Sequence, residues 1–282
     1  MNTVTPAVAP AAPATLRLPS PARLGLARGG LEIKSFFRQR EAVVFTFSLP
    51  VILLLIFGEI FHGKVDHTNV DFRQYFAAGI IASGIMSSTF VSLGIAIALE
   101  RDDGTLKRLA GTPMPKAAYF IGKAISALVI SVAEVAILLA FGVAFFGLHL
   151  PATPGRWFTF GWVLVLGVAT CALLGIAVSS LAGGARSAPA VLNLPYLVLS
   201  FISGVYFVFT SLPKGLQQVA AIFPLKWLCQ GLRSAFLPES LLAAEPAHSW
   251  EQGRIALVLG AWFVGSLVLC VRTFRWQARD SG

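Results

Sequence analysis

The sequence predicts an all-helical integral membrane protein with six transmembrane helices. An N-terminal interfacial amphipathic helix and two short outer-leaflet helices between the fifth and sixth spans complete the predicted fold. Of the 282 residues, 56% are hydrophobic and 12% are charged, whereas soluble domains average ~45–50% and ~25%. The mean hydropathy is +0.76, and six segments are apolar enough to cross the hydrocarbon core of a bilayer. So few charges cannot cover a soluble domain of this size, which excludes that class.

The N-terminal region divides into a tail and an amphipathic segment. Residues 1–20 are rich in Ala and Pro and lack a continuous apolar run, which favours a disordered tail over a cleavable signal peptide. From Pro21 to Arg40, basic residues mix with Leu, Ile and Phe, which is typical of a helix lying on a membrane surface. Gly25, Gly29 and Gly30 weaken the prediction of a helix in the first half of this segment.

The membrane domain is expected to cover residues 21–275, followed by a cytoplasmic tail at 276–282. Ser211 to Gly253 holds two semi-apolar runs split by Pro224, each too short to cross, which favours two helices in the outer leaflet. The six spans are expected at 42–61, 74–99, 117–146, 157–181, 188–210 and 254–275.

The distribution of basic residues orients the chain. Fifteen of the 22 Lys and Arg residues fall on the side of both termini and seven on the other, so the positive-inside rule places both termini in the cytoplasm. This distribution explains most of the net charge of +9 by membrane topology, and we expect no nucleic-acid partner.

The loop between the second and third spans is densely charged and faces the cytoplasm in this topology. Thr105 to Leu109 can form a short helix with Asp103 or Thr105 as its N-cap, and Gly111 and Pro113 stop it. A short charged helix tied to two spans is a suitable lever for a cytoplasmic partner. The alternative is a solvated loop that merely satisfies the positive-inside rule.

Two sequence runs carry a family resemblance. The run LERDDGTLKRLAGTPMPKAAYFIGK resembles the cytoplasmic loop of ABC-2 type exporter permeases through Glu100-Arg101, Gly104-Thr105, Leu106 with Leu109, and Gly111-Thr112-Pro113. The run FISGVYFVFTSLPKGLQQVAAIFPLKWLCQGLR is similar to the outer region of the same family through Ser203-Gly204, Leu212-Pro213, Phe223-Pro224 and Gly231-Leu232-Arg233. Lys226 departs from the small or hydroxyl residue expected after the outer proline. With the expected topology, the resemblance covers about residues 21–275.

The resemblance implies a dimer, formed with a second copy or a paralogue, in the bacterial inner membrane. Two ATP-binding subunits would dock on its cytoplasmic side, so ATP and Mg would belong to that partner and this chain would hold no cofactor. The sequence contains no phosphate loop, in agreement with a transport subunit that is not itself an enzyme. The coupling helix would comprise Glu100, Arg101, Asp102, Gly104, Thr105, Leu106, Arg108, Gly111 and Pro113.

Polar residues within the spans are candidates for a translocation path. Glu134 lies mid-way along the third span, where a charge costs ~2.5–3.5 kcal/mol, so it either makes a buried structural hydrogen bond or lines the path. Ser83 and Ser87 either allow close helix packing or line a groove. In the family the first, second and fifth spans line or close the path, which adds Asn193 and Tyr196.

The predicted function is export of a hydrophobic or amphipathic substrate such as a drug, lipid or glycan, including multidrug efflux. The alternative is a proton-coupled secondary transporter that uses Glu134. A membrane enzyme acting on lipid is a third hypothesis. Its only support is a weak cluster in the first outer loop, which is also the only weak candidate for a metal site: His62, Asp66, His67 and Asp71. We therefore predict no catalytic and no metal-ligating residue.

Overall fold

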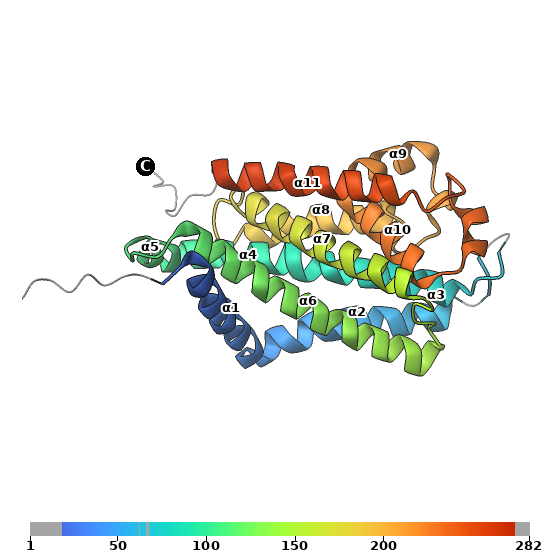
Figure 1. Cartoon of the computed structure of the whole chain (residues 1–282), viewed down its shortest axis with the longest axis horizontal. Coiled ribbons are helices and arrows are strands. Elements are labelled where there is room, and N and C mark those ends of the chain that lie inside the picture. Colours follow the sequence, from blue (N-terminus) through green and yellow to red (C-terminus); the bar gives the residue numbers. More distant parts are fainter. Residues whose placement is uncertain (1–18, 62, 66–67, 274–282) are drawn as a thin grey trace, which may run out of the picture.

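The computed structural model describes residues 19–61, 63–65 and 68–273, and these residues fold into helices joined by turns (Figure 1). Most of the tail predicted for residues 1–20, and the whole tail predicted for 276–282, lie outside the described residues. The described part contains no β-strand, only one isolated bridge between Lys64 and Asp71. The prediction of an all-helical protein is confirmed.

The first helix, α1 (Pro21–Arg38), is continuous through the glycines that weakened its prediction. Ser20 caps it, and Gly25 and Gly29 are its two buried residues. A Cβ on Gly25 would meet Ile121 at 2.5 Å, and one on Gly29 would meet Ile125 at 3.1 Å. The glycines therefore let α1 lie close against α6, and this packing outweighs their low helix propensity.

Five helices are long and apolar enough to span a membrane, judged by length and composition. They begin and end near the predicted boundaries, and the second is formed by three consecutive segments. The five are α2 (Arg40–Ile60), α3–η1–α4 (Phe72–Met86, Ser87–Ser92 and Leu93–Asp102), α6 (Lys116–Phe146), α7 (Pro154–Ser179) and α11 (Gln252–Thr273).

The predicted fifth span is shorter than expected. The helix α8 (Ala188–Ile202) has 15 residues and stops eight residues before the expected end at 210. The chain turns at Ser203 and Gly204, and Gly204 has φ of +78°, a left-handed conformation that glycine adopts without strain. The Gly204 carbonyl accepts a hydrogen bond from the buried guanidinium of Arg233, which holds the turn.

The segment after α8 holds two short helices, α9 (Lys214–Ile222) and α10 (Pro224–Phe236), with the break at the expected proline. Every residue of α10 is buried. Lys226, which departs from the family pattern, lies over the Trp227 ring at 3.6 Å and donates a hydrogen bond to Gln230. A 3-10 turn, η2 (Phe209–Ser211), precedes α9, and another, η3 (Glu239–Ala244), follows α10.

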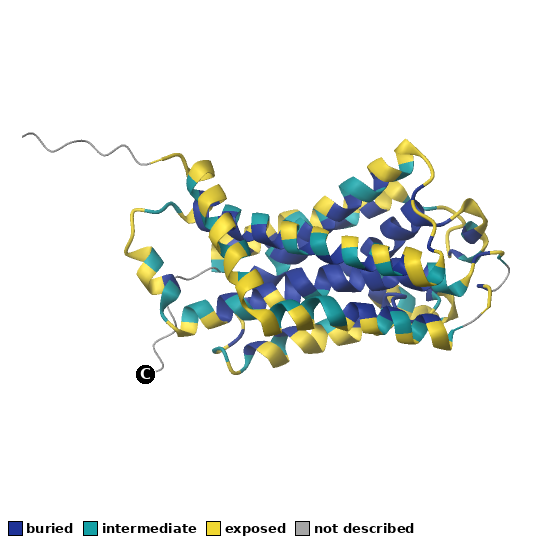
Figure 2. Ribbon diagram, turned by 90° about the horizontal axis from the view of Figure 1, so that it is seen from below, coloured by how far each residue is buried: buried dark blue, intermediate teal, exposed yellow. Residues whose placement is uncertain are grey.

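The composite helix α3–η1–α4 runs through the middle of the bundle (Figures 1 and 2). In its most apolar window 72% of residues are buried, against 22% in α2 and α11 and 28% in α6. Its middle six residues, Ser87–Ser92, form a π-helix, a local widening that often marks functional sites. The short helix α5 (Thr105–Ala110) follows its end, and α5, the start of α1 and the end of α11 lie at one end of the bundle (Figure 1).

Candidate coupling surface and translocation path

The short helix α5 is built by local capping. Gly104 precedes it with φ of +74°, and the Asp103 carboxylate accepts the Thr105 backbone N–H at 2.8 Å. The Thr105 hydroxyl and N–H hold the pKa of Asp103 below its usual range. Arg108 donates to the Thr105 hydroxyl at 2.9 Å, and Leu106 is fully buried beneath the helix. The N-cap residue is Gly104, so the prediction of Asp103 or Thr105 as the N-cap is wrong; Asp103, one residue earlier, nevertheless supplies a side-chain acceptor for the first helical N–H.

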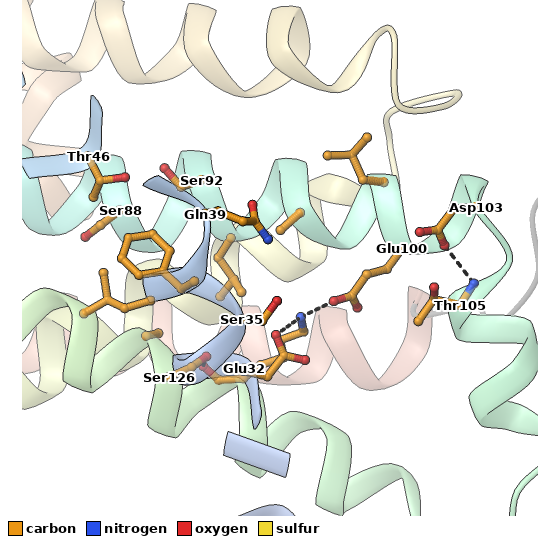
Figure 3. A pocket seen from close by; sticks show the side chains of 17 residues that line it. Glu32, Ser35, Gln39, Thr46, Ser88, Ser92, Glu100, Asp103, Thr105 and Ser126 are labelled. Atoms are coloured by element: carbon orange, nitrogen blue, oxygen red, sulfur yellow. Dashed lines mark hydrogen bonds and ion pairs between the residues drawn. The ribbon is translucent and has the colours of Figure 1, made fainter. Parts of the chain in front are cut away.

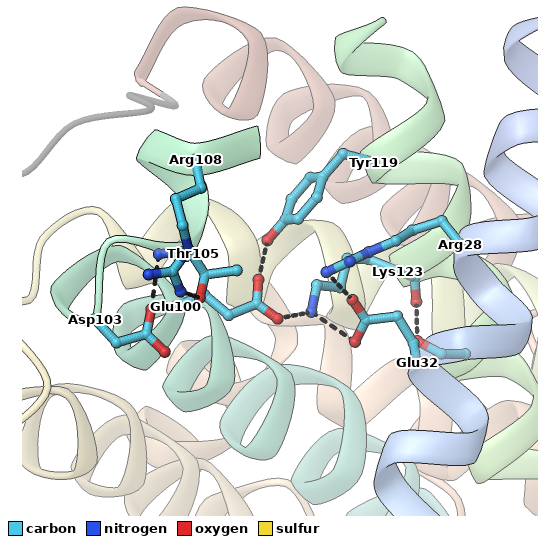
Figure 4. Close-up of polar contacts among 9 residues, drawn as sticks. Arg28, Glu32, Glu100, Asp103, Thr105, Arg108, Tyr119 and Lys123 are labelled. Atoms are coloured by element: carbon cyan, nitrogen blue, oxygen red, sulfur yellow. Dashed lines mark hydrogen bonds and ion pairs between the residues drawn. The ribbon is translucent and has the colours of Figure 1, made fainter. Parts of the chain in front are cut away.

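Glu100, at the end of α4, lies in a network of buried charges rather than facing outward (Figure 4). Its carboxylate accepts the Tyr119 hydroxyl at 2.8 Å and pairs with the Lys123 ammonium at 2.5 Å. Lys123, only 2% exposed, also pairs with Glu32 of α1 at 2.9 Å, and Arg28 pairs with the same Glu32 at 2.6 Å. The network joins α1, α4 and α6.

The two residues after Glu100 are fastened to α7 and to the turn that follows it. Arg101 donates to the Ser179 carbonyl at 2.6 Å, where α7 ends. The Asp102 carboxylate accepts the Ala185 backbone N–H at 2.7 Å. Three of the four charged side chains expected to contact a partner, Glu100, Arg101 and Asp102, are thus engaged within the chain. A direct contact of these or of Arg108 with a partner stays a prediction.

The outward face of the loop is formed by other members of the predicted set. Arg108, Gly111 and Pro113 are exposed, as is Lys107, whereas Gly104 and Thr105 are half-buried. The Arg108 guanidinium lies beside the Asp103 carboxylate and the Thr105 hydroxyl (Figure 4). The exposed face therefore presents two adjacent cations on a helix that is fixed from beneath.

Four of the five path candidates surround the start of the π-helix. The Ser83 and Tyr196 hydroxyls are 2.9 Å apart and join α3 to α8, with Ser87 beside Tyr196. Glu134 of α6 approaches the same part of α3, because a Cβ on Gly84 would meet its Oε1 at 2.7 Å. The structure separates Asn193 from this group: it is exposed, and its amide donates to the Pro189 carbonyl at 2.9 Å.

Glu134, unlike Glu100, is not part of a network of ion pairs. Its side chain is 1% exposed, and neither carboxylate oxygen makes a hydrogen bond of normal geometry to a described residue, although the Ser88 hydroxyl lies near enough to act on it. The neighbouring Ser88 hydroxyl already donates to the Gly84 carbonyl at 3.1 Å and lies 3.4 Å from the Ser131 hydroxyl. Both earlier interpretations of Glu134, a buried structural hydrogen bond and a place on the path, therefore stay predictions.

A cavity of about 400 Å³ lies between these two regions (Figure 3). Its walls come from α1, α2, η1, α4 and α6. Glu32, Glu100 and Lys123 line its end nearer α5, and Ser88 and Ile130 line its inner end. Such a volume falls within the range of small-molecule sites, about 300–1,000 Å³.

Sequence reasoning assigned no site role to Glu32, Tyr119 or Lys123. Lys123 was counted only in the charge distribution. A lysine inside an apolar span is costly unless it is paired, so its position could have indicated a buried ion pair. Of the weak outer-loop cluster, His62, Asp66 and His67 lie outside the described residues. Asp71 accepts the Arg73 N–H at 2.8 Å and caps α3.

The comparisons with known proteins agree with this geometry. A family model described as the ABC-2 type transporter matches residues 30–237, from the second half of α1 to the end of α10. The chain belongs to the ABC-2 type transporter family. The family assignment makes it a multi-pass membrane subunit of an ABC transporter and implies a partner subunit that binds ATP. It does not favour the proton-coupled alternative.

Two curated relatives carry matching names. The chain is 22% identical over 193 residues to the putative transport permease YvfS of Bacillus subtilis (strain 168), which covers 68% of this chain and 77% of the relative. It is 25% identical over 178 residues to the probable multidrug ABC transporter permease YbhR of Escherichia coli (strain K12), covering 62% of this chain and 46% of that relative. The matched region thus spans less than half the length of the second relative.

Proposed function

We propose that this chain is the permease of an ABC exporter that moves a hydrophobic or amphipathic substrate out of the cytoplasm or the inner leaflet. A separate subunit hydrolyses ATP and docks on the loop at 100–113, and two permeases, either identical or paralogous, form the transporter. The short apolar helix α8 completes six spans, with both termini in the cytoplasm of a bacterial inner membrane and α9 and α10 in the outer leaflet.

One observation carries the mechanism: the docking loop is fastened to three helices of the bundle. Glu100 bonds to Tyr119 and Lys123 on α6, and Arg101 bonds to the end of α7. Movement imposed on α5 by a partner would therefore displace α4, α6 and α7 together. Packed helices respond to such a force as rigid bodies rather than by continuous deformation.

The roles within the loop then divide in two. Exposed Lys107 and Arg108 form the contact with an acidic face of the ATP-binding subunit, since charged pairs steer association. Glu100, Arg101 and Asp102 transmit the motion, because their polar atoms are engaged inside the permease. The curated relative named a probable multidrug permease supports a drug-like substrate, and the path begins among the polar residues around the π-helix.

The test is a mild-detergent purification of the tagged chain from its native membrane, with identification and ATPase assay of the co-purifying proteins. We expect a stoichiometric phosphate-loop ATPase. Lys107→Glu with Arg108→Glu should release it, whereas Lys214→Glu, an exposed lysine at the start of α9, should not. Glu100→Ala with Arg101→Ala should retain the ATPase and membrane insertion but lose ATP-driven export. Absence of an ATPase from the wild-type preparation would overturn the proposal.

A further inference from the structure

The carboxylate of Glu134 is the buried polar group whose presence the fold leaves unexplained. Buried polar atoms in proteins are nearly always hydrogen-bonded, yet neither oxygen of Glu134 makes a hydrogen bond of normal geometry to a described residue. No cationic side chain of the described part of the chain acts on this carboxylate. A group that the protein does not satisfy, in a span where a charge costs ~2.5–3.5 kcal/mol, needs a function.

The cavity in Figure 3 ends one helical turn short of this carboxylate, which does not itself line it. Ile130 lines the inner end of the cavity, and Glu134 is one turn further along α6, about 5.4 Å. On the opposite wall Ser88 lines the cavity, and Gly84, against which the Glu134 carboxylate packs, is one turn away on α3. The absence of a side chain at Gly84 leaves room for the carboxylate there.

The charges along the cavity differ between its two ends. At the end nearer α5 Lys123 is held between Glu32 and Glu100, so this ammonium is not free to serve Glu134. The lining between the ends is uncharged: Phe36, Leu93 and Ile130 are apolar, and Ser35, Gln39 and Ser126 are polar. A molecule in the cavity would meet apolar walls and scattered hydroxyls, and Ser88 at the inner end separates the cavity from the buried Glu134 carboxylate.

We propose that the cavity inside the α1–α2 corner binds an amphipathic organic cation, with its ammonium group next to Glu134 and its apolar body against Phe36 and Ile130. The proposal rests on the function proposed above and names the substrate class of the same transporter. The cationic group of the ligand would supply the positive charge that no described side chain places beside Glu134. In a low-dielectric site such a pair is much stronger than in water, so a neutral molecule of the same shape should bind more weakly.

The test uses the intact complex of permease and ATP-binding subunit in lipid nanodiscs, with radiolabelled decyltrimethylammonium as the probe. Decyldimethylamine N-oxide, nearly the same shape and without net charge at pH 7.5, is the matched competitor. We expect saturable binding of the cation that is at least tenfold weaker in Glu134→Gln. The N-oxide should compete poorly with the cation in the wild-type complex, and its own affinity should not change in Glu134→Gln.

Two further variants separate an effect of the charge at Glu134 from a general effect of substitution. Glu134→Asp retains the charge and should retain the preference for the cation over the N-oxide, even if both affinities fall. Glu239→Gln makes the same substitution at an exposed carboxylate outside the cavity and should bind like the wild type. Cation binding that is absent, or unchanged in Glu134→Gln, would overturn this proposal. If the same complex still hydrolyses ATP and exports another substrate, only the substrate class fails and the proposed function stands.

Discussion

Two acidic sites that both involve α6, the half-buried Glu100 and the fully buried Glu134, differ in how they are satisfied. Glu100 at the end of α4 shares Lys123 with Glu32 and accepts the Tyr119 hydroxyl (Figure 4). Glu134, mid-way along α6, has no cation beside it and makes no hydrogen bond of normal geometry to a described residue; Ser88 is the hydroxyl that acts on it. In the first site each carboxylate faces a cation, although Arg28 Nε and Glu32 Oε1 make no hydrogen bond of normal geometry, whereas the carboxylate of the second site has no cation beside it.

This difference indicates two roles: Glu100 holds helices together, whereas Glu134 is available to bind a ligand. A network of ion pairs that joins three helices holds those helices in one arrangement. Removing one partner leaves the other charges unpaired and lowers the stability of the fold. A buried charge without an opposite charge beside it gains no attraction within the chain, and a cationic ligand can supply that charge. If the roles differ in this way, substitutions at the two sites should change the stability of the protein in opposite directions.

The largest effect is expected for Lys123→Met. The substitution leaves Glu100 without a cation and removes one of the two cations on Glu32, and breaking a buried pair in this way costs about 3–5 kcal/mol. Thermal unfolding in nanodiscs measures it. Lys116→Met, at an exposed lysine on the same helix, should change stability little. Equal effects of the two substitutions would show that the network does not fasten α1 to α6.

Glu134→Met is expected to act in the opposite direction. Replacing an unsatisfied buried polar group by an apolar side chain of similar size removes a penalty of about 1–3 kcal/mol, so the unfolding temperature should rise. The same variant should lose cation binding. A destabilisation as large as that of Lys123→Met would mean that the carboxylate has a structural partner, and the contrast between the two sites would fail.

Gly25→Ala should weaken the packing of α1 on α6. The added Cβ would meet Ile121 at 2.5 Å, and overpacking of this kind costs about 1–3 kcal/mol, partly offset by the better helix propensity of Ala. Gly30→Ala is the matched control, because a Cβ there meets nothing within 4 Å, and it should be neutral or stabilising by up to about 1 kcal/mol. Differential scanning fluorimetry of the two variants would separate the effects.

The smallest effect is expected at the α5 cap. Asp103→Ala removes the acceptor for the Thr105 N–H and should cost the helix about 1 kcal/mol, detected as faster amide exchange across residues 105–110. Asp103→Asn keeps an acceptor and should exchange nearly as the wild type. Because the folded pKa of Asp103 lies below its usual value, the contribution of its charge is full above about pH 4 and is lost as the pH falls through the folded pKa. Slow exchange in Asp103→Ala would contradict this capping role.

Hydropathy, charge distribution and proline positions were sufficient to predict most of the helices. The hydropathy and length of the apolar segments located α2, α6, α7 and α11, and Pro224 marked the break between α9 and α10. The end of α8 was misplaced because Ser203 and Gly204 stand within an apolar run, and the turn depends on a hydrogen bond from Arg233, 29 residues further along the chain.

The candidate site was less predictable, since pairing of charges is a tertiary property. Glu100 was expected to face a partner, and nothing in the sequence shows that Lys123 and Glu32 surround it. The same limit applies to the π-helix at Ser87–Ser92, where local propensity does not distinguish a π turn from an α turn. By contrast, Glu134 was recognisable from its position alone, because an acidic residue mid-way along an apolar span is rare.

The most direct test of the two-site account is the ATPase rate of the reconstituted complex with and without decyltrimethylammonium. The account predicts that the cation stimulates the wild-type complex. Glu134→Gln should keep the basal rate and lose the stimulation, whereas Glu100→Ala with Arg101→Ala should still bind the cation but no longer respond to it. Stimulation of the Glu134→Gln complex to the wild-type level would contradict the account.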